Sequence, residues 1–516
     1  MPIRNRFLRL AALMCSASCL LLADASITRS PAGWKLANGD IEFTLSRAGD
    51  EVRVDSLRRA GGQEWAAAGS RLSAFLEGES LGALRFAADD TTDFGGGAKQ
   101  LALRFQSAAG GVLSLLLRIY PSGAAIEFAA ELENKSQRTL PLLFRIDPLS
   151  LTLKGALKPY SSIRDSHGFH LAGTLAGARE FKDWLVLENA GAGESALIGG
   201  EIGAGILDWR ANTRAADSGV AVRAGNVFRH DRKTAPPPAY EIQPGQKVET
   251  PIAFLALAKG DSDNAGNEAF RYLKRYVFPK PLADTPLATY CIWLTHANVE
   301  EILDKELAFA KRTGFDVFYH DASWFEGASI IPGQNNWSKG LGSYKESREK
   351  FPSGLKALSD KVRAAGLKFG IWVDPGNVDV GRVESGEIPK EWLATIDGKP
   401  LITEHPSLTP MRQLCLGNPQ VVEWVEKQLS GIIDQWNIEW VKWDPSGTVS
   451  FACDRTDHGH GKRDGPHASY RGKIEILGYL MRRYPRLLGF EVDPSLHFAR
   501  TNPGPPDLLP GGYRDE

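Results

Sequence analysis

Cysteine is scarce in this chain of 516 residues, which contains only five. Two of them, Cys15 and Cys19, lie in an apolar stretch near the N-terminus. The other three, Cys291, Cys415 and Cys453, are odd in number and widely spaced along the chain. This pattern argues against a disulfide framework and against a CxxC metal site. We therefore expect the three cysteines to be small buried apolar residues.

The sequence also lacks an excess of charge of either sign. Lysine and arginine total 61 and aspartate and glutamate total 62, so the formal net charge is −1. There is no long run of basic residues, which argues against a nucleic-acid partner and against a basic helix on a membrane surface. The expected partner is neither a polyanion nor a bilayer. Nothing in the composition excludes a homo-oligomer.

Long apolar runs are absent except near the N-terminus. A basic segment with Arg4, Arg6 and Arg9 comes first. The apolar stretch Leu10–Leu22 and the small-residue motif Ala23–Ala25 follow it. This order is typical of a signal peptide over residues 1–25, and the apolar stretch is shorter than the roughly 20 residues that span a bilayer. The sequence therefore predicts a soluble protein that is exported to the periplasm or the medium.

The first half of the chain has the rhythm of an antiparallel β-sandwich. Large apolar residues alternate with polar ones in short runs, as at Ile41, Phe43 and Leu45. Clusters of Gly, Asn and Ser separate these runs, as expected for turns between strands. We predict a β-sandwich over residues 30–260, without a catalytic constellation of its own. A helical stretch and a Pro-rich joint then predict a linker helix over residues 261–284.

The second half, residues 285–516, alternates apolar strands with amphipathic helices. We predict strands at 288–295, 316–319, 368–373, 438–443 and 487–492. The helices between them are predicted to begin near 298, at Ser353, at Pro419 and near 469. Apolar strands that alternate with helices pair in parallel through right-handed crossovers. A barrel and an open doubly wound sheet both fit this pattern.

Aspartates follow the ends of the predicted strands. They are Asp321, Asp374, Asp444 and Asp493. In a parallel sheet these ends lie along the edge where ligands bind, although any one Asp before a turn also commonly just ends a strand. Large indoles lie near the same ends: Trp293, Trp324, Trp372 and Trp443. Carboxylates accept hydrogen bonds from hydroxyl groups and indoles offer apolar faces, so together they predict a carbohydrate site.

Lys442 and Asp444 form the most specific pair at this edge. They lie two residues apart in a predicted strand, so both side chains should point to the same side of the sheet. A nearby cation lowers the pKa of a carboxylate and keeps it ionised. Asp444 is therefore predicted to be a nucleophile that attacks an anomeric carbon, and the alternative is an ordinary surface ion pair.

Several motifs of the second half resemble those of glycoside hydrolase clan D. They are FYHDASWF (318–325), FGIWVDPGNVD (369–379) and VKWDPSG (441–447). They are most similar to glycoside hydrolase family 36, the α-galactosidases and raffinose synthases. The resemblance extends over about residues 35–490. It implies an N-terminal β-supersandwich followed by a (β/α)8 TIM-type barrel.

The resemblance also implies a reaction and a set of site residues. It implies hydrolysis of terminal α-galactosides with retention of configuration, through a glycosyl-enzyme intermediate and without a cofactor. The implied partner is an oligosaccharide or glycoside substrate, and the implied nucleophile is Asp444. The implied substrate-binding residues are Asp321, Trp324, Lys442, Trp293, Trp372 and Asp374.

The chain departs from the family pattern in ways that bear on activity. His320 and Ala322 replace family residues, and Asp374 stands where the family usually has Glu. The family's acid/base Asp follows a sixth strand, which we do not recognise in this sequence. We therefore expect an incomplete barrel, either truncated or degenerate, with an unidentified acid/base. A vestigial carbohydrate-binding relative and an enzyme for another α-glycoside are the alternatives.

Metal-ligand residue types are concentrated in the segment Cys453–His467, CDRTDHGHGKRDGPH. Its spacing matches no standard zinc pattern. The resemblance to glycoside hydrolase family 36 implies that this segment is a loop on the substrate side of the barrel. The sequence therefore predicts no metal site.

Overall fold

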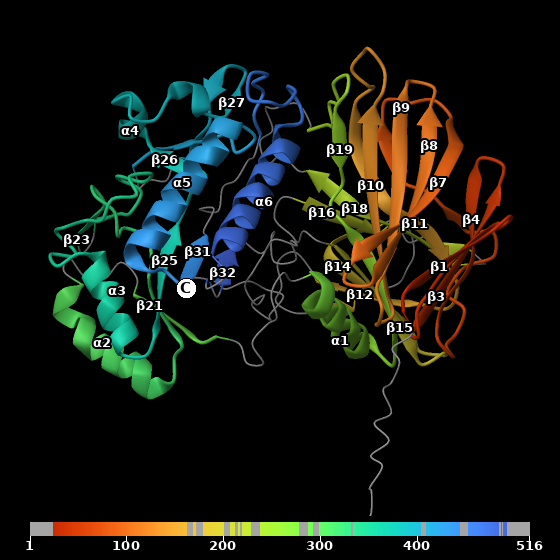
Figure 1. Cartoon of the computed structure of the whole chain (residues 1–516), viewed down its shortest axis with the longest axis horizontal. Coiled ribbons are helices and arrows are strands. Elements are labelled where there is room, and N and C mark those ends of the chain that lie inside the picture. The colour runs from red at the N-terminus through yellow and green to blue at the C-terminus, as the bar shows by residue number, and fades with distance from the viewer. Residues whose placement is uncertain are drawn as a thin grey trace, which may run out of the picture.

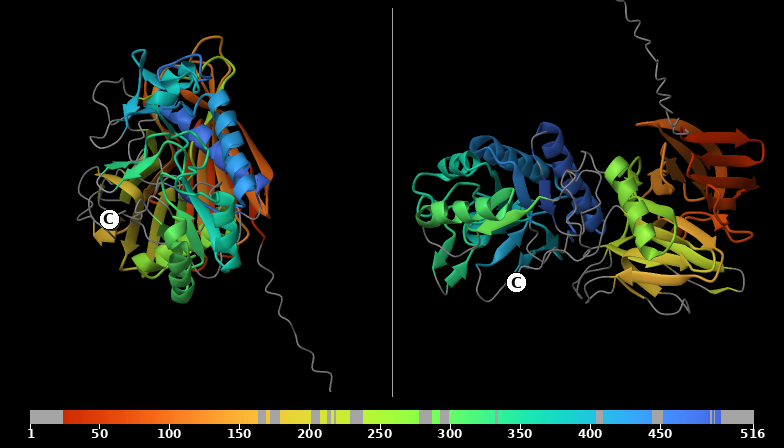
Figure 2. Two further views of the ribbon diagram at one scale, coloured as in Figure 1. Left: turned by 90° about the vertical axis from the view of Figure 1, so that its left-hand side faces the viewer. Right: turned by 90° about the horizontal axis from the view of Figure 1, so that it is seen from below.

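The computed structural model consists of two lobes, one built mainly of strands and the other of alternating strands and helices (Figure 1). Figure 2 shows the same two lobes side by side in a view from below. The residues that the structure describes are 24–162, 169–171, 179–200, 207–211, 215–216, 219–228, 238–277, 287–292, 299–331, 334–403, 409–443, 452–484, 487 and 489–492.

The first lobe contains strands β1 to β20, which pair in antiparallel fashion. Strands β1 to β5 form one sheet, and the others form a second sheet whose main path is β6-β11-β18-β16-β14-β15-β20-β10-β9-β8-β7. The bounds are β1 (Ser26–Ser30), β2 (Gly33–Ala37), β3 (Ile41–Ala48), β4 (Glu51–Arg59), β5 (Arg71–Leu72), β6 (Phe75–Gly78), β7 (Leu84–Gly95), β8 (Ala98–Ser107), β9 (Gly111–Ile119), β10 (Ala125–Asn134), β11 (Leu143–Leu153), β12 (Lys158–Ser162), β13 (Phe169–Leu171), β14 (Arg179–Asn189), β15 (Glu194–Gly200), β16 (Leu207–Ala211), β17 (Ala215–Ala216), β18 (Gly219–Phe228), β19 (Lys247–Glu249) and β20 (Ala253–Lys259).

The alternation of apolar and polar residues accounts for the core of this lobe. In β3, Ile41, Phe43 and Leu45 are at most 1% exposed, whereas the residues between them are only half-buried. The same core takes up apolar residues from both sheets. Each apolar Å² removed from water stabilises the fold by roughly 25 cal/mol. The prediction of an antiparallel β structure in the first half is confirmed.

Helix α1 (Ser262–Tyr272) and a π-helical turn (Leu273–Val277) follow the last strand of the first lobe. A capping box led by Asp261 starts the helix. Its apolar face, with Ala265 and Ala269, packs on residues of the large sheet such as Phe254. The segment that we predicted as a linker helix is therefore a layer of the β lobe.

The second lobe contains strands β21 to β32 and helices α2 to α6. The strand bounds are β21 (Thr289–Ile292), β22 (Val317–His320), β23 (Ser329–Ile331), β24 (Gln334–Asn336), β25 (Lys368–Val373), β26 (Asn377–Asp379), β27 (Thr395–Ile396), β28 (Lys399–Pro400), β29 (Ile402–Thr403), β30 (Met411–Gln413), β31 (Trp440–Trp443) and β32 (Gly489–Val492). The helices are α2 (Glu300–Thr313), α3 (Leu355–Ala364), α4 (Val380–Glu384), a 3-10 turn (Lys390–Trp392), α5 (Pro419–Trp436) and α6 (Gly465–Arg483).

Five strands of this lobe form a parallel sheet in the order β21-β22-β25-β31-β32. Each of the five predicted strands overlaps one of them. Strands that pair in chain order are typical of a TIM-type barrel, whereas the order reverses within a doubly wound sheet. The structure therefore favours the barrel alternative, although the described sheet has five strands and is not closed.

Most helix ends follow the signals seen in the sequence. Gly314 ends α2 with a φ of 89°, and the side chain of Asn418 caps α5 by accepting a backbone N–H. Helix α3 does not begin with Ser353 as its cap, although we predicted that the helix begins there. The N-cap is Gly354, and Oγ of Ser353 donates to Oε2 of Glu300 at 2.8 Å. None of the described helices has the length and apolar character needed to cross a membrane.

Short strands that the sequence did not predict lie in the loops after β22 and β25. Strands β23 and β24 pair with each other, and β26, β30 and β29 form a small sheet. These strands have only two or three residues, too few for a periodic apolar pattern. Because they follow the carboxyl ends of parallel strands, they surround the edge on which we predicted the ligand site.

Helix α6 and the loop before it join the two lobes. The carbonyl of Arg463 accepts the N–H of Ala239 at 2.9 Å, and its own N–H donates to Oε2 of Glu241 at 3.2 Å. The rings of His467 and Tyr240 meet edge to face with centroids 5.1 Å apart. Figure 1 accordingly shows α6 as the helix of the second lobe that lies beside the β lobe.

Candidate active site

The carboxyl ends of β22, β25 and β31 lie side by side along one edge of the parallel sheet. His320 at the end of β22 is in register with Ile371 in β25. Val373 at the end of β25 is in register with Trp443 at the end of β31. The residues that follow these ends therefore gather at the edge on which the sequence placed the site.

Most of the predicted site residues are described by the structure: Asp321, Trp324, Trp372, Asp374 and Lys442. Asp444 and Trp293 lie outside the described residues. Their predicted roles, as nucleophile and as substrate contact, stay predictions.

Asp321 and Lys442 form a buried ion pair. Asp321 follows β22 and Lys442 belongs to β31, the two strands that flank β25. Nζ of Lys442 lies 3.2 Å from Oδ2 of Asp321, and each side chain is 6% exposed. The two motifs that carried these residues in the sequence are therefore in direct contact.

A glycine in β25 allows the side chains of β22 and β31 to meet. Tyr319 and Trp440, two residues before Asp321 and Lys442, contact each other with ring centroids 4.6 Å apart. Gly370 lies in the strand between them. A Cβ atom at Gly370 would lie 2.8 Å from a side-chain atom of Tyr319 and 2.8 Å from a side-chain atom of Trp440. Because side chains two residues apart share a face of a strand, Asp321 and Lys442 are expected on the same face as this gap, and Trp372 is the residue of β25 in register with Lys442.

Burial opposes the charge of Asp321. Burial raises the pKa of Asp321, and the ammonium of Lys442 offsets only part of that rise. We had argued that a neighbouring lysine lowers a carboxylate pKa, and at Asp321 burial outweighs that effect. Oδ1 accepts the N–H of Ala322 at 2.7 Å, and Sγ of Cys291 lies 3.5 Å from Oδ2. Burial, together with this carboxylate, raises the pKa of the Cys291 thiol, which therefore donates its S–H.

A strained turn after β22 holds Asp321 in place. Ser323 has a φ of 71°, in the left-handed region that non-glycine residues seldom adopt. Nζ of Lys350 donates to the carbonyl oxygen and to Oγ of Ser323, both at 2.8 Å. Nδ1 of His320 donates to the carbonyl oxygen of Asp321 at 2.7 Å. Lys350 could not be recognised from the sequence, because a single lysine in a distant loop forms no motif.

Trp324 and Trp372 are buried against each other near the ends of β22 and β25. Both are 1% exposed. Nε1 of Trp324 donates to the carbonyl oxygen of Trp372 at 2.7 Å, and Trp372 packs edge to face on Trp337 with centroids 5.6 Å apart. In this arrangement the two indoles support the strand ends. The predicted stacking on a substrate would require their rings to be uncovered.

Asp374 is engaged in local hydrogen bonds after β25. Oδ1 accepts the N–H of Gly376 at 3.1 Å, and Oδ2 accepts an N–H from Nδ2 of Asn377 at 3.0 Å. Burial, with the Asp374 charge nearby, raises the pKa of Tyr344. Asp374 thus lies at the predicted edge, but its hydrogen bonds also fit the alternative of an Asp that ends a strand.

The structure also gathers metal-ligand side chains that the sequence did not connect. Cys415, Cys453, His458 and His460 are buried, and one ligand atom from each lies within 4.8 Å of the others. Cys415 follows β30, whereas the other three lie in the loop before α6. The prediction of no metal site considered only the segment 453–467 and left out Cys415, which α5 and β31 separate from that segment in the sequence.

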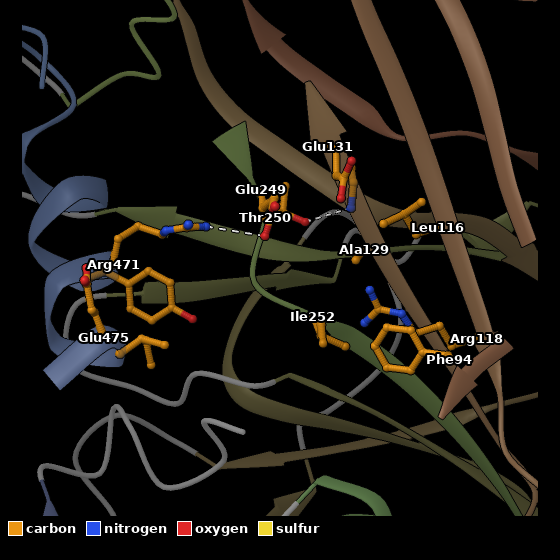
Figure 3. Close-up of a pocket in the computed structure, with 13 residues that line it drawn as sticks. Phe94, Leu116, Arg118, Ala129, Glu131, Glu249, Thr250, Ile252, Arg471 and Glu475 are labelled. Atoms are coloured by element: carbon orange, nitrogen blue, oxygen red, sulfur yellow. Dashed lines mark hydrogen bonds and ion pairs between the residues drawn. The ribbon is translucent and has the colours of Figure 1, made fainter. Parts of the chain in front are cut away.

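A cavity of about 460 Å³ lies elsewhere, between the β lobe and α6. Glu249, Thr250 and Ile252 line it on one side and Arg471 and Glu475 on the other (Figure 3). Nη1 of Arg471 reaches across to Oε2 of Glu249 at 3.5 Å. None of the predicted site residues lines this cavity, so the candidate active site is the strand edge.

Comparison with known proteins relates the second lobe to sugar-cleaving enzymes. Residues 288–496 match the family model of Melibiase. An α-galactosidase of Lactobacillus acidophilus is 28% identical over 260 residues, which cover 48% of this chain and 33% of that protein. The matched region thus spans about a third of the length of that relative.

Solved structures show the same fold for both lobes. An α-galactosidase of glycoside hydrolase family 36 from Geobacillus stearothermophilus has a TM-score of 0.71 at 17% identity, covering 92% of this chain and 74% of that one. A variant of a second α-galactosidase from that organism, solved with stachyose, has a TM-score of 0.70 at 17% identity, covering 90% and 74%. Residues 288–496 are therefore similar to the Melibiase family, and the chain shares its fold with an α-galactosidase of glycoside hydrolase family 36.

Proposed function

We propose that this chain is a retaining glycoside hydrolase that acts on terminal α-galactosides. The observation that carries the proposal is the buried Lys442–Asp321 pair at the carboxyl edge of a parallel sheet that matches Melibiase. Asp444 comes directly after Trp443, the last residue of β31 at that edge. The names of the related enzymes and the stachyose complex of a structural neighbour favour a galactoside within an oligosaccharide.

In the proposed reaction a carboxylate oxygen of Asp444 attacks the anomeric carbon, and the bond from that carbon to the leaving oxygen breaks. The leaving oxygen takes a proton from a general acid. A water molecule then gives a proton to the same group and displaces Asp444, which restores the original configuration. Lys442 keeps the nucleophile ionised, and Asp321 accepts hydrogen bonds from sugar hydroxyls. We assign the acid/base to no described residue.

Replacing Asp444 with Asn tests the nucleophile. We expect kcat/KM for 4-nitrophenyl α-galactoside to fall by roughly a thousandfold or more, with the thermal midpoint little changed. The control is Asp434→Asn, which removes a half-exposed carboxylate near the end of α5. The control should keep its activity. Full activity of the Asp444→Asn variant would remove the assignment.

A non-catalytic carbohydrate-binding protein is the second candidate. It is favoured by the candidate site, in which no described residue is assigned as the acid/base. The leaving group separates the candidates, because nitrophenolate needs little protonation and the alkoxide released from raffinose needs a general acid. Cleavage of both substrates supports a complete enzyme. Binding of raffinose in calorimetry, without cleavage of either substrate, supports the binding protein.

The sugar and the location of the protein are part of the proposal. Nitrophenyl α-glucoside and α-N-acetylgalactosaminide, assayed beside the galactoside, test the alternative of another α-glycoside. Export is supported by the signal-peptide pattern of residues 1–25, most of which lie outside the described residues. N-terminal sequencing of the protein from the periplasm or medium should begin at Ser26. An intact N-terminus would contradict export with cleavage at this site.

A further inference from the structure

We propose that Cys415, Cys453, His458 and His460 bind a structural zinc ion. The inference goes beyond the proposed glycosidase activity and does not depend on it. Cys415 lies two residues after the end of β30, and the other three lie between β31 and α6. A shared ion would therefore tie two loops at the carboxyl side of the parallel sheet to each other.

The distances between the ligand atoms fit a tetrahedral ion. Sγ of Cys415 lies 3.3 Å from Nε2 of His460, and Sγ of Cys453 lies 3.6 Å from Nδ1 of His458. Zinc bonds of about 2.3 Å to sulfur and about 2.0–2.1 Å to nitrogen place neighbouring ligand atoms roughly 3.3–3.8 Å apart. All four atoms lie within 4.8 Å of one another, so a small contraction completes the tetrahedron.

Hydrogen bonds fix each imidazole with a lone pair toward the cluster. Nε2 of His458 donates to the carbonyl oxygen of Glu391 at 2.5 Å, which leaves Nδ1 as the lone-pair nitrogen. Nδ1 of His460 donates to the carbonyl oxygen of Gly461 at 2.8 Å, which leaves Nε2, and Oδ1 of Asp464 lies 3.5 Å from the same Nδ1. Metal-binding histidines in proteins are held in this way by carbonyl and carboxylate oxygens.

The surroundings of the two sulfurs suit thiolates bound to a metal. Cys415 and Cys453 pack in a small apolar cluster with Ala394 and Leu401, which keeps water away. The backbone N–H of Gly417 nevertheless points at the sulfur of Cys415, and that of Arg455 points at the sulfur of Cys453. A thiolate buried in this way needs a cation as partner.

The ligand set identifies both the metal and its role. Two thiolates and two imidazoles in a tetrahedral arrangement are typical of zinc, and four protein ligands leave no open position for a substrate. The ion would therefore hold structure and would not take part in catalysis. It would fix the loop between the end of β31 and Arg463, where the two lobes meet.

Metal analysis of the full chain tests the site. Protein purified without a histidine tag and without chelator should contain about one zinc per chain by mass spectrometry. Cys415→Ser and Cys453→Ser should each lower that content at least about tenfold. Cys291→Ser is the matched control, because Cys291 is the third described cysteine and lies beside Asp321, outside the cluster. It should keep its zinc.

A second measurement guards against variants that lose metal because they do not fold. Cobalt added to wild-type protein stripped of zinc should give the intense absorption of a tetrahedral ion with thiolate ligands, and zinc should displace it. Absence of that spectrum, or full zinc content in Cys453→Ser, would overturn the proposal. A Cys415–Cys453 disulfide in unreduced protein that lacks zinc would also overturn it. None of these measurements uses a glycosidase assay. A negative result for the zinc site can therefore be distinguished from a negative result for the proposed function.

Discussion

His320 is expected to make the second lobe less stable in mild acid. The residue is 3% exposed, and its ring packs on Phe351 with centroids 5.1 Å apart. Burial, aided by the ammonium of Lys350, lowers its pKa from 6.5 to about 3. The unfolded chain therefore binds a proton at a pH where the folded protein does not. The stability that His320 contributes is present above pH 6.5 and is lost as the pH falls toward 3. Between about pH 7.5 and about pH 5 the loss is about 2 kcal/mol.

Replacing His320 with Asn removes this dependence and keeps an N–H donor for the carbonyl of Asp321. We expect the thermal midpoint of the wild type, followed by circular dichroism, to drop between the two pH values by about 4–8 °C more than that of the variant. The lowered pKa of His467, about 4, acts in both proteins and cancels. Phe351→Leu is the control, because it loosens packing on the same ring without removing a titratable group. This control should lower the thermal midpoint at both pH values and leave the difference between the two midpoints as it is in the wild type. Equal pH-dependent drops in wild type and His320→Asn would refute the reasoning.

Two further predictions concern the candidate site and its sheet. Asp321→Asn takes the carboxylate away from the buried ammonium of Lys442 and should lower the free energy of unfolding by about 3–5 kcal/mol. The Asp321→Asn/Lys442→Met double variant should lose less than the sum of the two single changes in urea unfolding, and strict additivity would contradict the pair. Gly370→Ala places a Cβ 2.8 Å from side chains of both flanking strands and should cost about 1–3 kcal/mol. Gly431→Ala, in α5 with nothing within 4 Å of the new atom, should instead stabilise by about 1 kcal/mol in the same thermal assay, and a neutral Gly370→Ala would contradict the described packing.

The sequence predicted the parallel strands because their signal is local. The runs that end at Val373 and Trp443 are mostly apolar and each is followed by an Asp, a pattern that fits strands buried on both faces. Their order in the sheet could not be chosen from the sequence, since a barrel and a doubly wound sheet have the same local pattern. Ser353 had the right chemistry for a cap, but its hydroxyl is taken by Glu300 from the preceding helix. A contact between residues so far apart in the chain cannot be recognised from the local sequence around Ser353.

The candidate site was predicted only as far as its residues follow strand ends. Asp321 and Lys442 lie in motifs of that kind, and the structure pairs them. The burial of Trp324 depends on residues that pack on it from other elements, and a motif does not encode them. Cys415 and His460 are neighbours because α5 and β31 bring the chain back, and no spacing rule reports a contact of that range.

The contact between the lobes has a consequence for how the chain folds during synthesis. Arg463 and Glu241, which join the lobes, are 222 positions apart. The last strand of the β lobe ends at Lys259, so this lobe leaves the ribosome whole while α6 has yet to be made. Domains fold as units in the order in which they emerge, so the early lobe presents a finished surface on which the later helix docks. A substitution that damages that surface would therefore delay folding of the second lobe without altering any of its residues.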